Sequence, residues 1–157
     1  MESLEIRAVA CRVLVGEVTM NQTPIDCAGA LTEMYAAFQR GDIPAILEML
    51  DDNVEWESWA DNYAQRTHVP WLAPRKGKQG AADFFAIVGA MKFHTFRVIA
   101  VLGGPGQAAG EVEIDAELSG GKRLRDQELH LVNFNEAGKV VRFRHYLDTA
   151  KHIVAAK

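Results

Sequence analysis

Residues 36–59, AAFQRGDIPAILEMLDDNVEWESW, set the order of the first elements in this chain. Gly41 is a typical helix stop, and Asp42 directly after it is a typical cap for a second, short helix with apolar residues at helical spacing. The polar run 51–53 ends that helix, and the alternation of apolar and polar residues over 54–59 predicts a strand. The stretch therefore predicts two helices and a strand in close succession.

Two further segments flank this stretch. On its N-terminal side a longer helix is expected to begin near Thr23, which can cap it, and Leu31, Tyr35 and Phe38 give that helix one apolar face. On its C-terminal side, residues 60–77 lack periodicity but carry aromatic side chains. That composition predicts a loop folded over an apolar surface.

The rest of the chain contains one more helix and then strands separated by glycine-rich turns. The helix is expected at about residues 80–91. The strands are expected at 94–102, 111–118, 124–134 and 140–147, with a short helix or tail from residue 148. Helices followed by an antiparallel meander are the order of an α+β fold, not of a parallel α/β sheet.

Length and composition favour one stable domain. The chain has 157 residues, of which 48% are apolar, so it can bury a core without disulfides. We expect residues 23–157 to form this domain and residues 1–22 to be an N-terminal extension or an edge strand.

Charge and cysteine content bear on partners and location. A formal net charge of −4 gives no positive field for phosphates, so nucleic acid is not an expected partner. Cys11 and Cys27 lack metal-ligand spacing and are expected to be reduced, which favours a cytoplasmic location. The apolar run 8–16 is interrupted by Arg12 and is too short to span a bilayer, so no membrane partner is expected.

The last predicted hairpin places polar groups inside. Along 140–147, arginines alternate with Val141, Phe143, His145 and Leu147, and the second set is expected to face inward. A four-residue loop between Phe134 and Lys139 makes directly opposed residue numbers sum to 273. The inward set on the preceding strand is then Asp126, Glu128, His130, Val132 and Phe134. Either Glu128 lies opposite His145, or, with a loop two residues tighter, His130 does.

Two imidazoles and a carboxylate on an inner sheet face suit proton transfer near neutral pH. The alternative is that each histidine is a buried, hydrogen-bonded group without chemistry. A metal site is disfavoured because no His-x-x-x-His spacing is present and a further ligand would have to come from elsewhere.

The strand at 111–118 alternates acids with apolar residues, which predicts acids facing solvent. However, Leu129 and Leu131 belong to the outward set of the next strand, beside Arg142 and Arg144. A second copy could therefore pack on this outer face to form a homodimer, and the acids Glu111, Glu113, Asp115 and Glu117 could then turn inward.

Three segments resemble one family. Residues 36–59 resemble the first helices and strand of SnoaL-like and ketosteroid-isomerase-like proteins of the nuclear transport factor 2-like superfamily. KGKQGAADFF (76–85) looks like their third helix, and LHLVNFNEAGKVVRFRHYLDTA (129–150) looks like their closing hairpin. The resemblance covers about residues 24–150.

The resemblance implies a cone-shaped α+β barrel, in which N-terminal helices pack on a strongly curved, mostly antiparallel sheet that encloses one pocket. Proteins of this kind are usually dimeric and commonly use no cofactor. His130 falls at the position similar to the acid that donates to the oxyanion in ketosteroid isomerases. His145 and Asp115 fall at or near positions resembling catalytic aspartates of limonene-type epoxide hydrolases.

The departures from those families exclude intact catalytic sets. Ser58 occupies the base position of the steroid isomerases, and Met34 occupies their phenol position, with Tyr35 one step away. An epoxide hydrolase would need an arginine near Glu113, where this chain has an acid.

The resemblance therefore favours a SnoaL-like acid/base role, in which a proton is moved next to a carbonyl of a small, partly apolar compound. His130 would be the principal acid/base, Asp115 or Glu128 its orienting partner, and His145 a donor to developing oxyanion charge. The predicted pocket residues are Tyr35, Phe38, Trp56, Ser58, Trp59, Tyr63, Trp71, Phe85, Glu113, Phe143 and Leu147. The alternatives are a non-catalytic module that binds a small hydrophobic ligand, and a dimeric scaffold with a vestigial pocket.

Overall fold

The computed structural model describes residues 25–157, so the predicted extension 1–22 and the predicted cap at Thr23 lie outside the described residues. Helix α1 spans Cys27–Gln39, and its cap is Asp26, whose side chain accepts a hydrogen bond from the Gly29 N–H at 2.8 Å. The helix start is thus a few residues later than the sequence predicts, because Asp26 satisfies a free N–H of the first turn.

Helix α2 spans Ile43–Met49 and is capped by Asp42, as predicted. Strand β1 spans Leu50–Trp56, so residues 51–53 belong to the strand and do not form a turn. The strand also ends earlier than predicted. Glu57 has a backbone φ of 54°, which extended structure does not allow.

Several short elements occupy the segment that the sequence predicts as a loop. They are α3 (Tyr63–Arg66), a 3-10 turn at Pro70–Leu72 and β2 (Arg75–Lys76). Helix α4 follows at Gly77–Gly89, close to its predicted position. Trp71 and Leu72 are buried, which confirms that this segment folds over an apolar surface.

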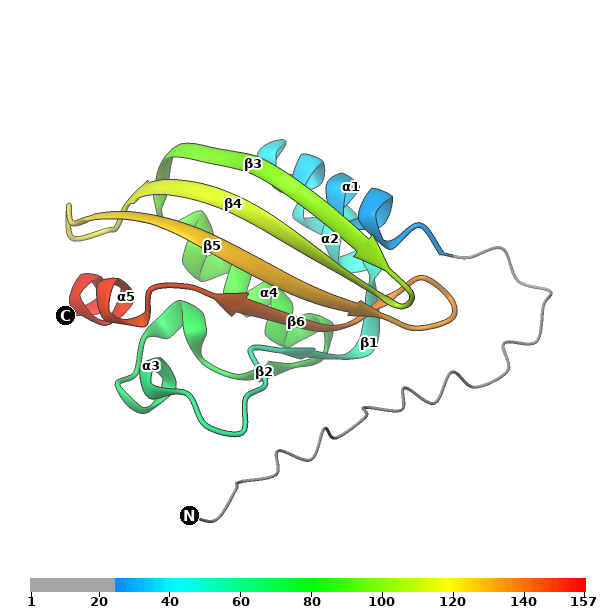
Figure 1. The fold of residues 1–157 in the computed structure, drawn as a ribbon. Helices are drawn as coiled ribbons and strands as arrows, with labels where there is room; N and C mark the ends of the chain where they lie inside the picture. The colour runs from blue at the N-terminus through cyan, green and yellow to red at the C-terminus, as the bar shows by residue number, and fades with distance from the viewer. Residues whose placement is uncertain (1–24) are drawn as a thin grey trace, which may run out of the picture.

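The sheet contains the predicted meander. Strands β3 (Lys92–Gly104), β4 (Gln107–Glu117), β5 (Arg123–Phe134) and β6 (Val140–Tyr146) are followed by α5 (Thr149–Ala156). The order of the six strands is β2-β1-β6-β5-β4-β3, and only β1 and β6 pair in parallel. The predicted α+β class with a mostly antiparallel, curved sheet is confirmed (Figure 1). The sheet itself is open, with β2 and β3 at its edges.

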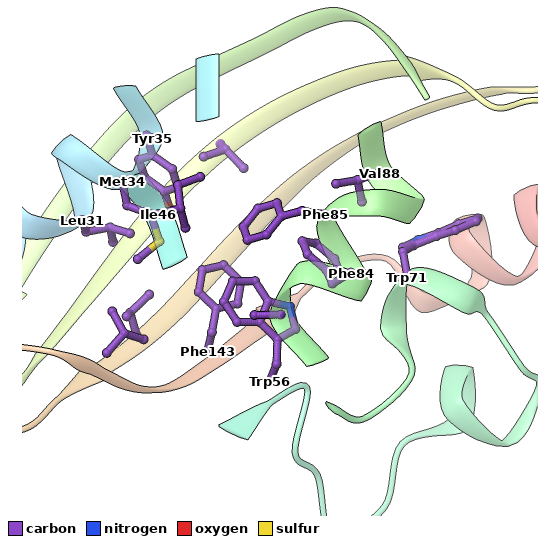
Figure 2. Close-up of a cluster of buried hydrophobic side chains, with 14 of the residues drawn as sticks. Leu31, Met34, Tyr35, Ile46, Trp56, Trp71, Phe84, Phe85, Val88 and Phe143 are labelled. Atoms are coloured by element: carbon purple, nitrogen blue, oxygen red, sulfur yellow. The ribbon is translucent and has the colours of Figure 1, made fainter. Parts of the chain in front are cut away.

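Helices cover the inner face of the sheet and one of its ends. Helix α1 packs on β3 and β4, α4 packs on β1, and α5 contacts β5 and α3 at one end of the sheet (Figure 1). Side chains from α1, α2 and α4 meet Trp56 and Phe143 of the sheet in the core (Figure 2). Among residues 25–157, no helix is long and apolar enough to cross a membrane.

The register of the closing hairpin differs from the predicted one, in which the numbers of directly opposed residues sum to 273. The backbone N–H of Asn135 donates to the carbonyl of Lys139, so the loop has three residues rather than four. The pairing then shifts by one more residue between Phe134 and Asn133, which is a β-bulge. As a result His130 lies directly opposite His145, and Glu128 does not.

A glycine makes room for the pocket. Gly110 of β4 lies opposite His130 of β5, and a Cβ at this position would lie 2.0 Å from the Tyr35 hydroxyl oxygen. We predict that Gly110→Ala displaces Tyr35 and lowers the free energy of unfolding by about 1–3 kcal/mol, the usual cost of overpacking. Gly104→Ala is the control, because a Cβ there meets no atom within 4 Å. Urea unfolding of the two variants measures the difference, and equal stability would contradict this account of Gly110.

Candidate active site

A largely apolar cavity of about 80 Å³ lies between the inner face of the sheet and the helices. Its aromatic walls include Trp56 and Phe143, whose rings stack with centroids 4.2 Å apart (Figure 2). Seven of the predicted pocket residues line it: Tyr35, Phe38, Trp56, Trp71, Phe85, Phe143 and Leu147. The polar side chains among the lining residues are Tyr35, Glu128, His130, His145 and His152, with the Trp56 and Trp71 indoles.

Four predicted pocket residues lie elsewhere. Tyr63 is 60% exposed, and Glu113 pairs with Arg97 on the outer face of the sheet. Ser58 and Trp59 do not line the cavity, and Trp59 packs against Tyr146. The positive φ of the preceding residue interrupts the strand alternation on which their predicted direction depended.

Asp115 is also outside the pocket, so its predicted catalytic role is wrong. Its neighbours Ile114 and Ala116 are buried on the inner face, whereas Asp115 points outward and forms ion pairs with Arg123 and Arg125. The hydrogen bond from Arg123 holds the pKa of this carboxyl below its usual range. The acids of β4 therefore follow the simple solvent-facing pattern.

The inward set of β5 is confirmed, and it brings Glu128 and His130 together. His130 Nε2 lies 3.2 Å from Glu128 Oε2, and His130 Nδ1 lies 3.1 Å from the Tyr35 hydroxyl. A carboxylate only accepts hydrogen bonds, so Nε2 carries the proton and Nδ1 accepts from the Tyr35 O–H. His130 is thus a neutral imidazole with a defined tautomer.

Burial shifts the pKa of each of the three hydrogen-bonded groups, Tyr35, His130 and Glu128. Burial and the positive charge of His145 hold the pKa of His130 below its usual range, although the hydrogen bond to Glu128 opposes them. Burial alone would raise the pKa of Glu128, but hydrogen bonds from His130 and His152 and the charge of His145 lower it overall. Burial and the charge of Glu128 raise the pKa of the Tyr35 phenol. Near neutral pH, Glu128 is therefore an anion and Tyr35 a donor.

His145 pairs with a different carboxylate, Glu57, and its pKa is shifted in the other direction from that of His130. Its Nδ1 and its backbone N–H both bond to Glu57 Oε1, while Glu57 Oε2 accepts from the Trp59 indole at 3.0 Å. Burial alone would lower the pKa of His145, but the charge of Glu57 and the hydrogen bond to it raise it above its usual range. Within residues 25–157 the His145 ring bonds through Nδ1, so the N–H at Nε2 is available to a ligand in the cavity that His145 lines.

Glu57 and His152 are site residues that the sequence patterns do not reveal. Glu57 is fully buried, yet alternation along β1 predicts that it faces away from the core; only its φ of 54° turns it inward. His152 is 1% exposed and lies on α5, which the sequence predicts only as a short helix or tail. Asp126 was expected to face inward, and it is buried beside His152.

Two clusters of described residues bring potential metal ligands together: Glu128, His130 and His145, and Asp126, Glu128 and His152. In the second cluster the Trp71 indole N–H donates to His152 Nδ1 at 2.8 Å. The proton of neutral His152 is therefore on Nε2, which leaves no lone pair there for a metal. In the first cluster the His130 Nε2–H already bonds to Glu128. The Nε2 atoms of His130 and His152 thus carry protons that are directed at carboxylates, so they are not free to bind a metal. We therefore assign neither cluster as a metal site.

Comparison with known proteins identifies similar chains. Residues 31–143 match the family model of the SnoaL-like domain. No curated protein sequence matches the chain significantly.

Solved structures share the fold at low sequence identity. A nuclear transport factor 2-like protein from Burkholderia thailandensis is 19% identical with a TM-score of 0.70, and the alignment covers 87% of this chain and 99% of that one. A Mycobacterium tuberculosis protein in complex with estradiol-17β-hemisuccinate is 20% identical with a TM-score of 0.61, covering 78% and 93%. TerC, co-crystallised with polyporic acid, is 18% identical with a TM-score of 0.65, covering 82% and 95%.

The buried Glu57–His145 pair predicts a pH-dependent stability. Because the folded pKa of His145 is raised, the pair stabilises the fold fully below the ordinary histidine pKa of about 6.5. That contribution is lost as the pH rises through the raised value. We therefore expect Glu57→Gln to cost about 3–5 kcal/mol at pH 6, the usual cost of breaking a buried ion pair, and less at pH 9.

Urea unfolding across this pH range measures the effect. Glu55→Gln is the matched control, because Glu55 is exposed on β1, two residues before Glu57. A cost of Glu57→Gln that does not change with pH would show that His145 is not charged in the folded protein.

Proposed function

Because this chain belongs to the SnoaL-like domain family, we propose that its pocket is the active site of a cofactor-independent acid/base enzyme acting on a small, partly apolar carbonyl compound. The observation that carries the proposal is the pairing of two adjacent histidines, one neutral and one cationic. The rings of His130 and His145 lie 4.4 Å apart, centroid to centroid, in an apolar cavity. Adjacent groups whose pKa values are pushed apart are the arrangement that acid/base catalysis needs.

The charge states assign the roles. Cationic His145 donates its Nε2–H to the carbonyl oxygen of the substrate, which stabilises the enolate that forms when a neighbouring C–H bond breaks. The released proton passes to the Tyr35 oxygen as the Tyr35 proton moves to His130 Nδ1, and Glu128 stabilises the resulting imidazolium. Return of the proton to another carbon gives an isomer. Attack of the enolate carbon on a second carbonyl gives an aldol ring closure, and neither outcome requires an oxidant or reductant.

The cavity restricts the substrate class. A volume of about 80 Å³ is below the range of roughly 300–1,000 Å³ that drug-sized ligands occupy. A compact carbonyl compound with an apolar body therefore fits best. The organic ligands in two of the similar structures support the use of this fold for small-molecule binding.

A second candidate function has its own supporting observation. Both ring nitrogens of His130 are already bonded within the protein, to Glu128 and to the Tyr35 hydroxyl. A pocket in which His130 keeps both bonds while a ligand fills the apolar space would be a binding module without chemistry.

Turnover decides between the two functions. We predict that small aromatic, polyketide-like or terpenoid carbonyl compounds raise the Tm of the wild type, of His130→Ala and of His145→Gln, and that either substitution lowers turnover about 10²–10⁴-fold. The wild-type rate should fall as the pH drops through the lowered pKa of His130 and as it rises through the raised pKa of His145, with a maximum between the two.

His94→Ala is the control, because His94 lies outside the pocket and pairs with Glu117. Stabilisation by a compound without turnover in the wild type would favour the binding module. If these compounds neither stabilise nor react with the wild type, both the acid/base enzyme and the binding module would be rejected.

We also infer a cytoplasmic homodimer that pairs through the outer face of the sheet. Leu129 and Tyr146 lie opposite each other on β5 and β6, and about two fifths of each side chain is exposed. We expect a dimer mass in sedimentation velocity and a monomer for Leu129→Glu. Val154→Glu is the control, since Val154 is exposed on helix α5 and does not belong to the paired strands β5 and β6. A monomer mass for the wild type at micromolar concentration would contradict the dimer.

A further inference from the structure

A buried polar cluster joins the last helix to the pocket. His152 of α5 is 1% exposed, and it lies beyond residues 31–143, the part of the chain that matches the family model. Its Nε2 atom lies 3.3 Å from Asp126 Oδ2 and 3.3 Å from Glu128 Oε1. The two oxygens share this nitrogen, so it is aligned with neither as a regular hydrogen bond.

The partner on the other side of the ring determines the tautomer of His152. The indole of Trp71 is only a donor, and its N–H lies 2.8 Å from His152 Nδ1. Nδ1 therefore accepts, and the ring proton is on Nε2, directed between the two carboxylates. A second ring proton would place two N–H donors face to face, so His152 serves Glu128 as a neutral donor.

N–H donors approach Glu128 from two sides. On one side, Trp71 of the 3-10 turn donates to His152 of α5, and the Nε2–H of His152 is directed between Asp126 and Glu128 Oε1. From α1, Tyr35 donates to His130, and His130 donates to Glu128 Oε2. An imidazole N–H thus lies beside each oxygen of the carboxylate. Rotation of Glu128 away from His130 would break the contacts with both His130 and His152.

We propose that His152 is a positioning residue of the pocket, and that its Nε2–H, held in place by Trp71, keeps the Glu128 carboxylate directed at His130. Helix α5 is then part of the site and not a tail. The positioning itself depends only on the folded protein. Its effect on rate rests on the proposed function.

Other charges near the cluster hold α5 in place. Asp126 Oδ1 accepts from Lys151 Nζ at 2.8 Å, and Asp126 Oδ2 accepts from the Asp148 backbone N–H at 2.9 Å. Asp148 in turn caps α5 through the N–H groups of Ala150 and Lys151. These contacts are on the Asp126 side, so substitution of His152 removes a donor from Glu128 while the helix keeps its other anchors.

Loss of the His152 donor has a defined consequence for His130. With Oε1 unpaired, the Glu128 carboxylate becomes more basic and accepts more strongly from His130, which favours protonated His130. Glu57 and His145 also face His130, and they remain in place. The titration of His130 should therefore move to higher pH, by up to about one pH unit, because the shared Nε2–H of His152 contributes at most as much as one hydrogen bond to a charged group.

The test is an NMR titration of the histidine rings in the full chain, which needs no substrate. His152→Leu removes the donor and should shift His130 upward. His152→Gln keeps an N–H near the position of Nε2 and should restore most of the wild-type value. Trp71→Phe keeps the ring but frees the tautomer, and should give a smaller shift in the same direction. Val154→Ala, exposed on the same helix, should change nothing.

The outcomes separate positioning from packing. An unchanged or lower His130 titration in folded His152→Leu, with only a reduced Tm, would overturn the proposal and leave His152 a structural residue. If a substrate is found, the acid side of the pH–rate profile should move with the His130 titration. A shifted titration in a protein without turnover would support the positioning role while rejecting the proposed catalysis.

Discussion

The buried carboxylate of Glu128 is the constraint on which the rest of the pocket depends. An anion in an apolar cavity is stable only if donors surround it, because removal from water is costly. This requirement determines the tautomer of His130, makes the Tyr35 hydroxyl a donor, and explains why α5 returns to the sheet with His152 buried. The open end of a curved sheet is in this way closed by polar contacts as well as by apolar packing.

The second acid–histidine pair has a different physical origin. Glu57 reaches His145 because the chain adopts a positive φ directly after β1, an uncommon conformation for a residue with a side chain. The carboxylate holds a positive charge on His145, and that charge in turn helps to keep His130 neutral. Two identical side chains on neighbouring strands therefore differ in charge, with His130 neutral and His145 cationic. The difference arises entirely from their partners.

Most of the fold follows from local patterns. Apolar spacing and caps predict α1, α2 and α4, and strict alternation predicts which residues of β4 and β5 face inward. These features depend on neighbours within a few residues, so they can be read along the chain. The short elements between β1 and α4 were not predicted, because their residues are ordered by burial against other parts of the molecule.

The sequence alone determined that Glu128, His130 and His145 share one face of the closing hairpin, because side-chain direction in a strand has a period of two. It favoured an outward direction for the acids of β4 and left the inward one open; the structure places them outward. Only the tertiary structure decided that His130 and His145 are directly opposed, since a three-residue loop and a bulge set that register. Glu57 and His152 joined the site for the same reason. The partners of His152 are distant in sequence, and the inward direction of Glu57 depends on one backbone angle. Neither feature leaves a periodic signal in the sequence.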